Sequence, residues 1–140
     1  MAERFSQNPI IKTQDIQPSQ PGLIVECVLN PGVFRFQDKT WLVLRVAERP
    51  VQREGFVSFP VMNGDGRLHI LEFSKDDPQL DLSDPRAVRY QGKWYLSTLS
   101  HLRLVCSDDG VHFYEPADFP TKIFGHSPLE TFGIEDCRVS

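Results

Sequence analysis

Polar residues that could bind a carbohydrate recur at one position of a repeated segment. Asn30 precedes Pro31, Asp84 precedes Pro85, and Asp136 occupies the same place in a partial third copy near the end of the sequence. Amide and carboxylate groups that converge from equivalent positions can bind the hydroxyls of a sugar. The alternative is local, because an Asn or Asp before proline is a good turn former. Both interpretations remain open from these residues alone.

A basic residue in an apolar strand is the second candidate. Arg45 lies in the segment 41–46, which is otherwise apolar. An isolated buried guanidinium is costly, so Arg45 must be paired or must reach a water-filled channel. The alternative is a structural role, in which Arg45 at the end of the strand extends its head into solvent or pairs with Glu48. If the repeats converge, four side chains should lie together, and Asp109 should lie apart on a turn: Asn30, Arg45, Asp84 and Asp136.

The other polar motifs favour structural roles. The segment 107–113, Ser-Asp-Asp-Gly-Val-His-Phe, has the composition of a hairpin turn followed by a packed aromatic ring. His126 could face a channel, although a simple loop position is the favoured explanation. The histidines have no metal-ligand spacing, and the sequence has neither a glycine-rich phosphate loop nor a nucleophile elbow. We therefore expect no metal and no cofactor.

The elements that must position these residues are short strands in a repeat. Residues 30–42 and 84–96 share Pro, Arg, an aromatic residue, Gln, Lys and Leu at the same offsets. A period of roughly 50 residues built from strands is typical of β-propeller blades. We expect an all-β protein, a β-propeller of which this chain covers about two blades. The expected parts are an extended arm over 1–22, a first blade over about 23–83, a second over about 84–134, and the start of a third over 135–140.

Turn residues separate the expected strands. Asn63-Gly64-Asp65-Gly66 and Gln91-Gly92 tolerate the positive φ angles of tight hairpins. No window has the spacing of an amphipathic helix. The expected strands are 33–37, 41–47, 55–62 and 67–73 in the first repeat, and 86–91, 93–99, 101–107 and 111–114 in the second.

Composition excludes several classes of partner. The chain has 140 residues, 40% of them hydrophobic, and a net charge of −4 without a dense Lys/Arg cluster, so nucleic acid is not expected as a partner. Three cysteines without a C-x-x-C spacing fit a reducing compartment. The sequence has no signal-peptide pattern and no apolar run of membrane-spanning length. A soluble cytoplasmic protein with no membrane association is expected.

Two blades cannot close a propeller, which needs about four. We therefore expect the sequence to be the N-terminal part of a longer protein; the alternative is a self-sufficient two-sheet β domain. Exposed strand edges would favour self-association of the isolated chain, which could form a homo-oligomer. We expect the isolated chain to melt at low temperature and to lack turnover.

Five motifs, taken in order, resemble the N-terminal portion of glycoside hydrolase family 130. The family contains five-bladed propellers and includes β-mannoside phosphorylases. The resemblance spans essentially the whole sequence, and its most diagnostic element is Glu-Asp-x-Arg. The motifs are Asn8-Pro9-Ile10-Ile11, Asn30-Pro31-Gly32-Val33, Leu42-Val43-Leu44-Arg45-Val46, Ser107-Asp108-Asp109-Gly110-Val111-His112-Phe113 and Phe132-Gly133-Ile134-Glu135-Asp136-Cys137-Arg138-Val139.

The resemblance implies a role for each residue that matches a family motif. Asp136 takes the place of the catalytic general acid. Asn30 and Arg45 match positions that hold the sugar in the −1 subsite. Glu135 and Arg138 complete the motif and are expected to orient the acid. Asp84 remains a further substrate-binding candidate because it occupies the same position of the repeat as Asn30 and Asp136.

The implied activity is that of an inverting glycoside phosphorylase acting on β-mannosides and giving mannose 1-phosphate. Its partners would be an oligosaccharide substrate and inorganic phosphate as co-substrate. Cys137 stands where many members have proline, which leaves both carboxylates in place and indicates a divergent subgroup. A β-mannoside hydrolase of the same family remains an alternative, as does a non-catalytic sugar-binding propeller or an inactive fragment.

Overall fold

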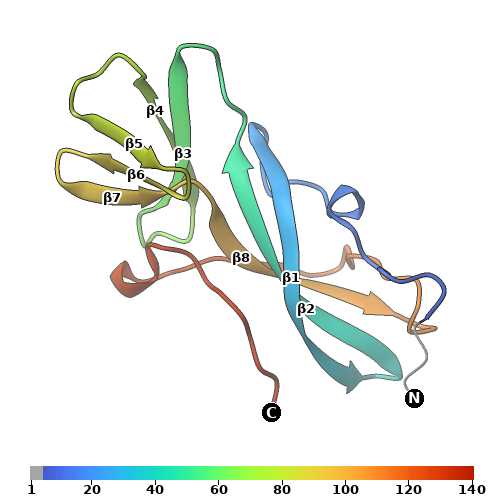
Figure 1. Cartoon of the computed structure of the whole chain (residues 1–140). Helices are drawn as coiled ribbons and strands as arrows, with labels where there is room; N and C mark the ends of the chain where they lie inside the picture. The colour runs from blue at the N-terminus through green and yellow to red at the C-terminus, as the bar shows by residue number, and fades with distance from the viewer. Residues whose placement is uncertain (1–4) are drawn as a thin grey trace.

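The chain is built from β-strands. The computed structural model describes residues 5–140, which form nine strands and two short 3-10 turns (Figure 1). The expected all-β class is therefore confirmed. The elements are η1 (Thr13–Asp15), β1 (Leu23–Phe36), β2 (Lys39–Pro50), β3 (Phe56–Met62), β4 (Leu68–Ser74), β5 (Leu80–Asp84), β6 (Ala87–Tyr90), β7 (Lys93–Leu96), β8 (Leu99–Ser107), β9 (Lys122–Ile123) and η2 (Pro128–Glu130).

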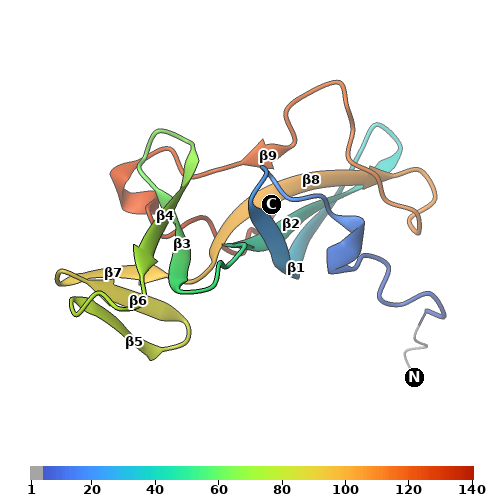
Figure 2. The same cartoon turned by 90° about the horizontal axis from the view of Figure 1, so that it is seen from above.

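The largest sheet has four antiparallel strands in the spatial order β1-β2-β8-β9. Seen from above, β1, β2 and β8 run alongside one another, whereas β3 to β7 lie to one side (Figure 2). Those five strands come between β2 and β8 in the sequence, yet none of them joins this sheet. They form a two-stranded sheet, β3-β4, and a three-stranded sheet, β5-β6-β7.

Aromatic rings pack the two smaller sheets together. Phe59 of β3 stacks on Phe73 of β4 with ring centroids 5.3 Å apart, and it lies 4.9 Å from the ring of Tyr95 on β7. Phe73 also contacts the ring of Tyr90 at 4.2 Å. Phe59 is fully buried. The strands between β2 and β8 therefore form a packed unit with its own apolar contacts.

The strand predictions are correct in most places and wrong in two respects. Seven of the expected strands overlap β1 to β4 and β6 to β8, but 111–114 forms only an isolated bridge between Cys106 and Tyr114. The backbone amides of Val111 and His112 bind the carboxylate of Asp109, so they are not available to a ladder. β5 and β9 lie outside the expected set.

The second difference concerns which strands share a sheet. β2 is largely buried, and its backbone groups are paired on both edges, by β1 and β8. It takes β8, an expected strand of the second repeat, rather than another strand of the first. In addition, β5 and β6 pair across the expected boundary between residues 83 and 84.

The repeat seen in the sequence corresponds to two similar hairpins in different sheets. β1 and β2 are joined by Gln37 and Asp38, with φ angles of 48° and 61°. β6 and β7 are joined in the same register by Gln91 and Gly92, with φ angles of 49° and 78°. Two-residue loops with positive φ match the twist of paired strands. The shared residues therefore encode a local turn.

One face of β2 forms the core and the other carries Arg45. Side chains alternate along a strand, so Leu42, Leu44 and Val46 point to one side, where they pack with Val105. The N-terminal arm covers this side through Ile16, which is buried in the same cluster. The opposite side carries Trp41, Val43 and Arg45. Residues 5–22 contain η1 and no strand, and residues 1–4 of the expected arm lie outside the described range.

Buried charged groups attach the arm to the sheet. Glu48 of β2 is fully buried and accepts hydrogen bonds from the Ser19 amide at 2.6 Å and the Ser19 hydroxyl at 2.5 Å. Arg103 of β8, also buried, donates to the backbone carbonyl of Gln17. Its Nη2 lies 2.9 Å from Nε2 of the buried His101. The arm is thus fixed by groups that lie on neighbouring strands.

In residues 5–140, no helix is long and apolar enough to cross a membrane.

Candidate functional site

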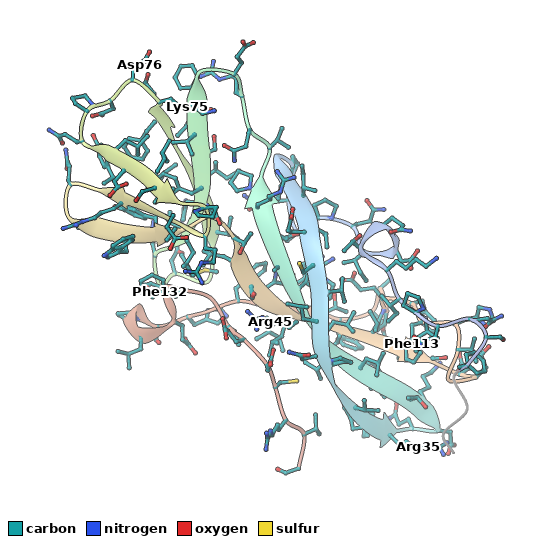
Figure 3. All side chains as sticks on the ribbon, viewed as in Figure 1. Arg35, Arg45, Lys75, Asp76, Phe113 and Phe132 are labelled. Carbon is teal, nitrogen blue, oxygen red and sulfur yellow. The ribbon has the colours of Figure 1, made fainter. Side chains whose placement is uncertain are left out.

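Arg45 lies at the centre of the site. Figure 3 shows it beside the C-terminal segment. Its Nη1 binds Oδ1 of Asp136 at 3.1 Å, its Nη2 binds Oε1 of Glu135 at 2.9 Å, and its Nε donates to the Ser100 hydroxyl at 3.0 Å. The Arg45 side chain is 20% exposed. Its partners are therefore the two acidic residues of the Glu-Asp-x-Arg motif, and the alternative pairing with Glu48 is wrong.

Asn30 reaches the same carboxylate from β1. Its Nδ2 donates to Oδ2 of Asp136 at 2.8 Å. Asn30 has a φ of 32°, and the β1–β2 register shifts between Leu29 and Gly32, so it lies in a β-bulge. Asparagine tolerates positive φ, and a bulge redirects a side chain out of the regular alternation. Asp136 is therefore held at both oxygens, by a guanidinium on one and an amide on the other.

At two glycines, the C-terminal segment that carries Glu135 and Asp136 packs closely against the sheet. Gly133 pairs with Ser100 of β8, and the amide of Ile134 donates to the Ser100 carbonyl at 2.9 Å. A Cβ added at Gly133 would lie 2.5 Å from that carbonyl oxygen, so only glycine fits there. A Cβ added at Gly32 would likewise lie 2.7 Å from Sγ of Cys137. The Cys137 thiol lies 3.6 Å from the carbonyl oxygen of Val43.

The charges around Asp136 favour its anionic form. The hydrogen bond from Arg45, followed by that from Asn30, lowers the pKa of the Asp136 carboxyl, and partial desolvation acts in the opposite direction. The side chain is 48% exposed. An accessible carboxylate in a fixed orientation can accept hydrogen bonds from sugar hydroxyls. It can act as a general acid only after it gains a proton in the complex with substrate.

Asp84 is not brought to this cluster. It ends β5, and its carboxylate accepts a hydrogen bond from the Arg86 amide at 2.9 Å and contacts the Arg86 guanidinium at 3.2 Å. These bonds lower its pKa. It lines a different cavity of about 390 Å³ together with Glu26 and Arg49. Asp84 therefore makes the local hydrogen bonds of a turn former, whereas Asn30 lies in a bulge within a strand.

The remaining motif residues differ in their surroundings. Glu135 is exposed apart from its pairing with Arg45. Arg138 is exposed, and within the described part of the chain its guanidinium makes no hydrogen bond or ion pair. His126 packs against Gly66 of the β3–β4 turn, where an added Cβ would lie 2.4 Å from the imidazole. Among the described residues, no group of three His, Cys, Asp or Glu side chains could hold a metal ion.

The segment 107–113 is a turn, as predicted. One carboxylate oxygen of Asp109 accepts the amides of Val111 and His112, each at 2.8 Å, and the other lies 2.6 Å from the His112 imidazole. These bonds hold the pKa of Asp109 well below its usual range, with the His112 side chain as the largest cause. Phe113 packs against the core. Both carboxylate oxygens of Asp109 are thus engaged by groups within its own turn.

Ser100 is the residue of this site that the sequence analysis missed. It contacts Arg45 through its hydroxyl and the acidic segment through its backbone. Its sequence context, an ordinary serine at the start of a buried strand, gives no signal of either contact. Only the pairing of β2 with β8 places it beside Arg45.

Comparison with known proteins assigns the fold and then the family. No protein-family model matches the chain. A solved structure of the β-1,2-mannobiose phosphorylase from Listeria innocua, in complex with β-1,2-mannobiose, matches with a TM-score of 0.79 and 35% identity over 98% of this chain and 40% of that one. The fold is therefore that of part of a glycoside phosphorylase.

The sequences agree with this assignment. The chain is 36% identical over 143 residues to the β-1,2-mannobiose phosphorylase of Listeria innocua serovar 6a, covering 98% of this chain and 40% of the relative. The chain belongs to glycoside hydrolase family 130, as its motifs indicated, and it spans about 40% of the length of this relative.

Proposed function

We propose that the chain carries the general acid and part of the sugar-binding site of an inverting β-mannoside phosphorylase. The supporting observation is the convergence of Arg45 and Asn30 on the two carboxylate oxygens of Asp136. All three match family motifs, and they reach one another from β1, β2 and the C-terminal segment. Glu135 shares the guanidinium of Arg45 and so helps to fix it.

The proposed chemistry follows from the leaving group. A glycosidic oxygen leaves poorly unless it is protonated as its bond to C1 breaks. Inorganic phosphate attacks C1 from the opposite face, the proton of Asp136 goes to the departing oxygen, and mannose 1-phosphate forms with inverted configuration. A bound sugar displaces water from Asp136, and this desolvation raises a carboxyl pKa toward the protonated form. Arg45 and Asn30 orient the group throughout.

For the substrate, we propose a β-1,2-linked mannoside with phosphate as co-substrate. The support is the name of the matched relative, a β-1,2-mannobiose phosphorylase, together with the retained Arg45, Asn30 and Asp136. A reducing, cytoplasmic location is part of the proposal, because the three cysteines are all free: Cys27, Cys106 and Cys137.

For the architecture, we propose that β1-β2-β8-β9 is one propeller blade and that 135–140 begins the next. The support is that these four antiparallel strands follow one another in space in chain order, as in a blade. Residues 51–98 would then be an insertion between the second and third strands. On this proposal Asp84 belongs to the insertion, which accounts for its separation from Asp136 despite the matching sequence repeat.

The test is product formation from β-1,2-mannobiose by the full-length protein, with and without phosphate. We expect mannose 1-phosphate only when phosphate is present. Asp136→Asn keeps the shape but cannot deliver a proton, so turnover should fall by about 100-fold or more, with a far smaller loss of sugar binding. Asp84→Asn is the matched control and should turn over normally.

Other outcomes of this assay would contradict the proposal and support one of its alternatives. Mannose released without phosphate would identify a hydrolase. Mannobiose binding without any turnover would identify a sugar-binding protein. Wild-type turnover by Asp136→Asn would place the acid elsewhere.

A further inference from the structure

We propose that Ser100 is the positioning residue of this site, and that it aligns the Arg45 guanidinium with the acidic segment. The catalytic consequence of this assignment rests on the proposed function, whereas the positioning itself does not. Ser100 is the second residue of β8, is 7% exposed, and faces Ala47 of β2. It touches both halves of the site, one through its side chain and the other through its backbone.

The hydroxyl sets the direction of the guanidinium. Arg45 presents its donors in a rigid planar fork, so fixing one edge fixes the others. With Nε bound to the Ser100 hydroxyl at 3.0 Å, Nη1 and Nη2 are left to face Asp136 and Glu135. Without the Ser100 hydroxyl, the guanidinium plane of Arg45 can rotate. The guanidinium then no longer keeps one fixed orientation that binds both carboxylates at once.

The backbone of Ser100 sets the register of the acidic segment. Its carbonyl accepts the Ile134 amide at 2.9 Å, directly before Glu135. Its pairing with Gly133 fixes where the segment leaves β8. An alanine at position 100 would keep these backbone bonds. The hydroxyl can therefore be removed on its own, and its effect separated from that of the strand.

A second buried serine on the same strand provides the comparison. Ser107 is fully buried, and its hydroxyl accepts the Gly110 amide at 2.8 Å and donates to Asp109. It stabilises the turn after β8 and lies away from Arg45. If a serine hydroxyl on β8 only filled space or stabilised the fold, Ser107→Ala and Ser100→Ala would act alike on the site.

The experiment follows two nuclear magnetic resonance signals in the full-length protein, namely hydrogen exchange at Nε of Arg45 and titration of the Asp136 carboxyl. We expect Ser100→Ala to speed the exchange by about tenfold, the effect of losing one hydrogen bond to a charged group. It should also raise the pKa of Asp136 toward its ordinary value. Ser100→Thr keeps a hydroxyl and should restore both signals. Ser107→Ala should lower the melting temperature and leave both unchanged.

Two results would overturn the proposal. One is a folded Ser100→Ala variant in which both signals are unchanged. The other needs no variant: the Arg45 Nε–H of the wild-type chain exchanging as fast as that of Arg35, which is exposed and whose guanidinium makes no hydrogen bond or ion pair within residues 5–140. Neither readout requires turnover, so failure of phosphorolysis alone would leave the positioning intact. If phosphorolysis is observed, Ser100→Ala should raise KM more than it lowers kcat, because Arg45 holds the sugar.

Discussion

At the scale of single residues, the site depends on one cation that serves two anions. Arg45 binds Glu135 and Asp136 at once, and Asn30 supplies a neutral donor to the second oxygen of Asp136. Without the guanidinium, the two neighbouring carboxylates would lose the cation that they share, and Asp136 would keep only the hydrogen bond from the Asn30 amide. The low pKa of Asp136 and the position of the acidic segment therefore both depend on Arg45.

Arg45→Ala tests this dependence. We expect the pKa of Asp136 to rise, since its largest lowering influence is removed. We also expect mannobiose binding by the full-length protein to weaken by about 1.5–3 kcal/mol, the value of a hydrogen bond to a charged group. Carboxyl titration and calorimetry measure the two effects. Arg86→Ala removes an exposed guanidinium that pairs with Asp84 and should change neither. Unchanged binding in Arg45→Ala would remove Arg45 from the sugar site.

At the scale of elements, the sequence predicts local structure better than sheet membership. The hairpins at Gln37-Asp38 and Gln91-Gly92 follow from turn chemistry that acts within a few residues. The pairing of β2 with β8 joins Arg45 to Leu102 across a long stretch of chain, and it depends on how buried strands pack rather than on either segment. For this reason the repeated segment predicts a hairpin correctly, but it does not specify that the second hairpin lies in a separate sheet.

The same distinction applies to the candidate site: some of its residues can be predicted from sequence motifs, whereas others depend on how the strands pair. Asp136, Arg45 and Asn30 could be predicted because the family motifs contain them. The bulge that turns Asn30 toward Asp136 is a property of the β1–β2 ladder, and no sequence pattern specifies it. Ser100 could not be predicted, since its two roles exist only when β8 lies beside β2 and the C-terminal segment crosses both.

Gly133→Ala tests how the crossing segment is held. The substitution places a Cβ 2.5 Å from the Ser100 carbonyl oxygen at a residue with a φ of 87°. Gly110→Ala is the matched control, because Gly110 has a φ of 75° and nothing within 4 Å of an added Cβ. Both should lose about 1 kcal/mol of stability or more from backbone strain. Only Gly133→Ala should also raise the pKa of Asp136, and equal titration curves for the two variants would contradict this.

At the scale of the whole molecule, a buried polar cluster joins the N-terminal arm to the four-stranded sheet. Glu48, His101 and Arg103 are all fully buried, and the first and last of them bind backbone groups of the arm. Nδ1 of His101 lies 3.5 Å from a Glu48 oxygen and has no hydrogen bond. Burial, assisted by the positive charge of Arg103, lowers the pKa of His101 to about 3. The imidazole is therefore neutral in the folded chain.

This neutral histidine predicts a loss of stability in mild acid. The unfolded chain gains a proton at His101 near pH 6.5, whereas the folded chain does not gain it until about pH 3. Between these values the unfolded state binds one more proton, so the free energy of unfolding falls as the pH falls, by at most about 1.4 kcal/mol per pH unit from this group. Above pH 6.5 the contribution is constant.

Denaturant unfolding of the full-length protein between pH 7 and pH 5.5 measures this slope, above the pH at which ordinary carboxyl groups are half protonated. His101→Gln cannot take up the proton, so its stability should be lower at pH 7 but nearly independent of pH across this window. His69→Gln is the matched control, because His69 is 44% exposed and lies outside the cluster, and it should keep the wild-type slope. A wild-type slope in His101→Gln would show that the acid sensitivity arises elsewhere in the molecule.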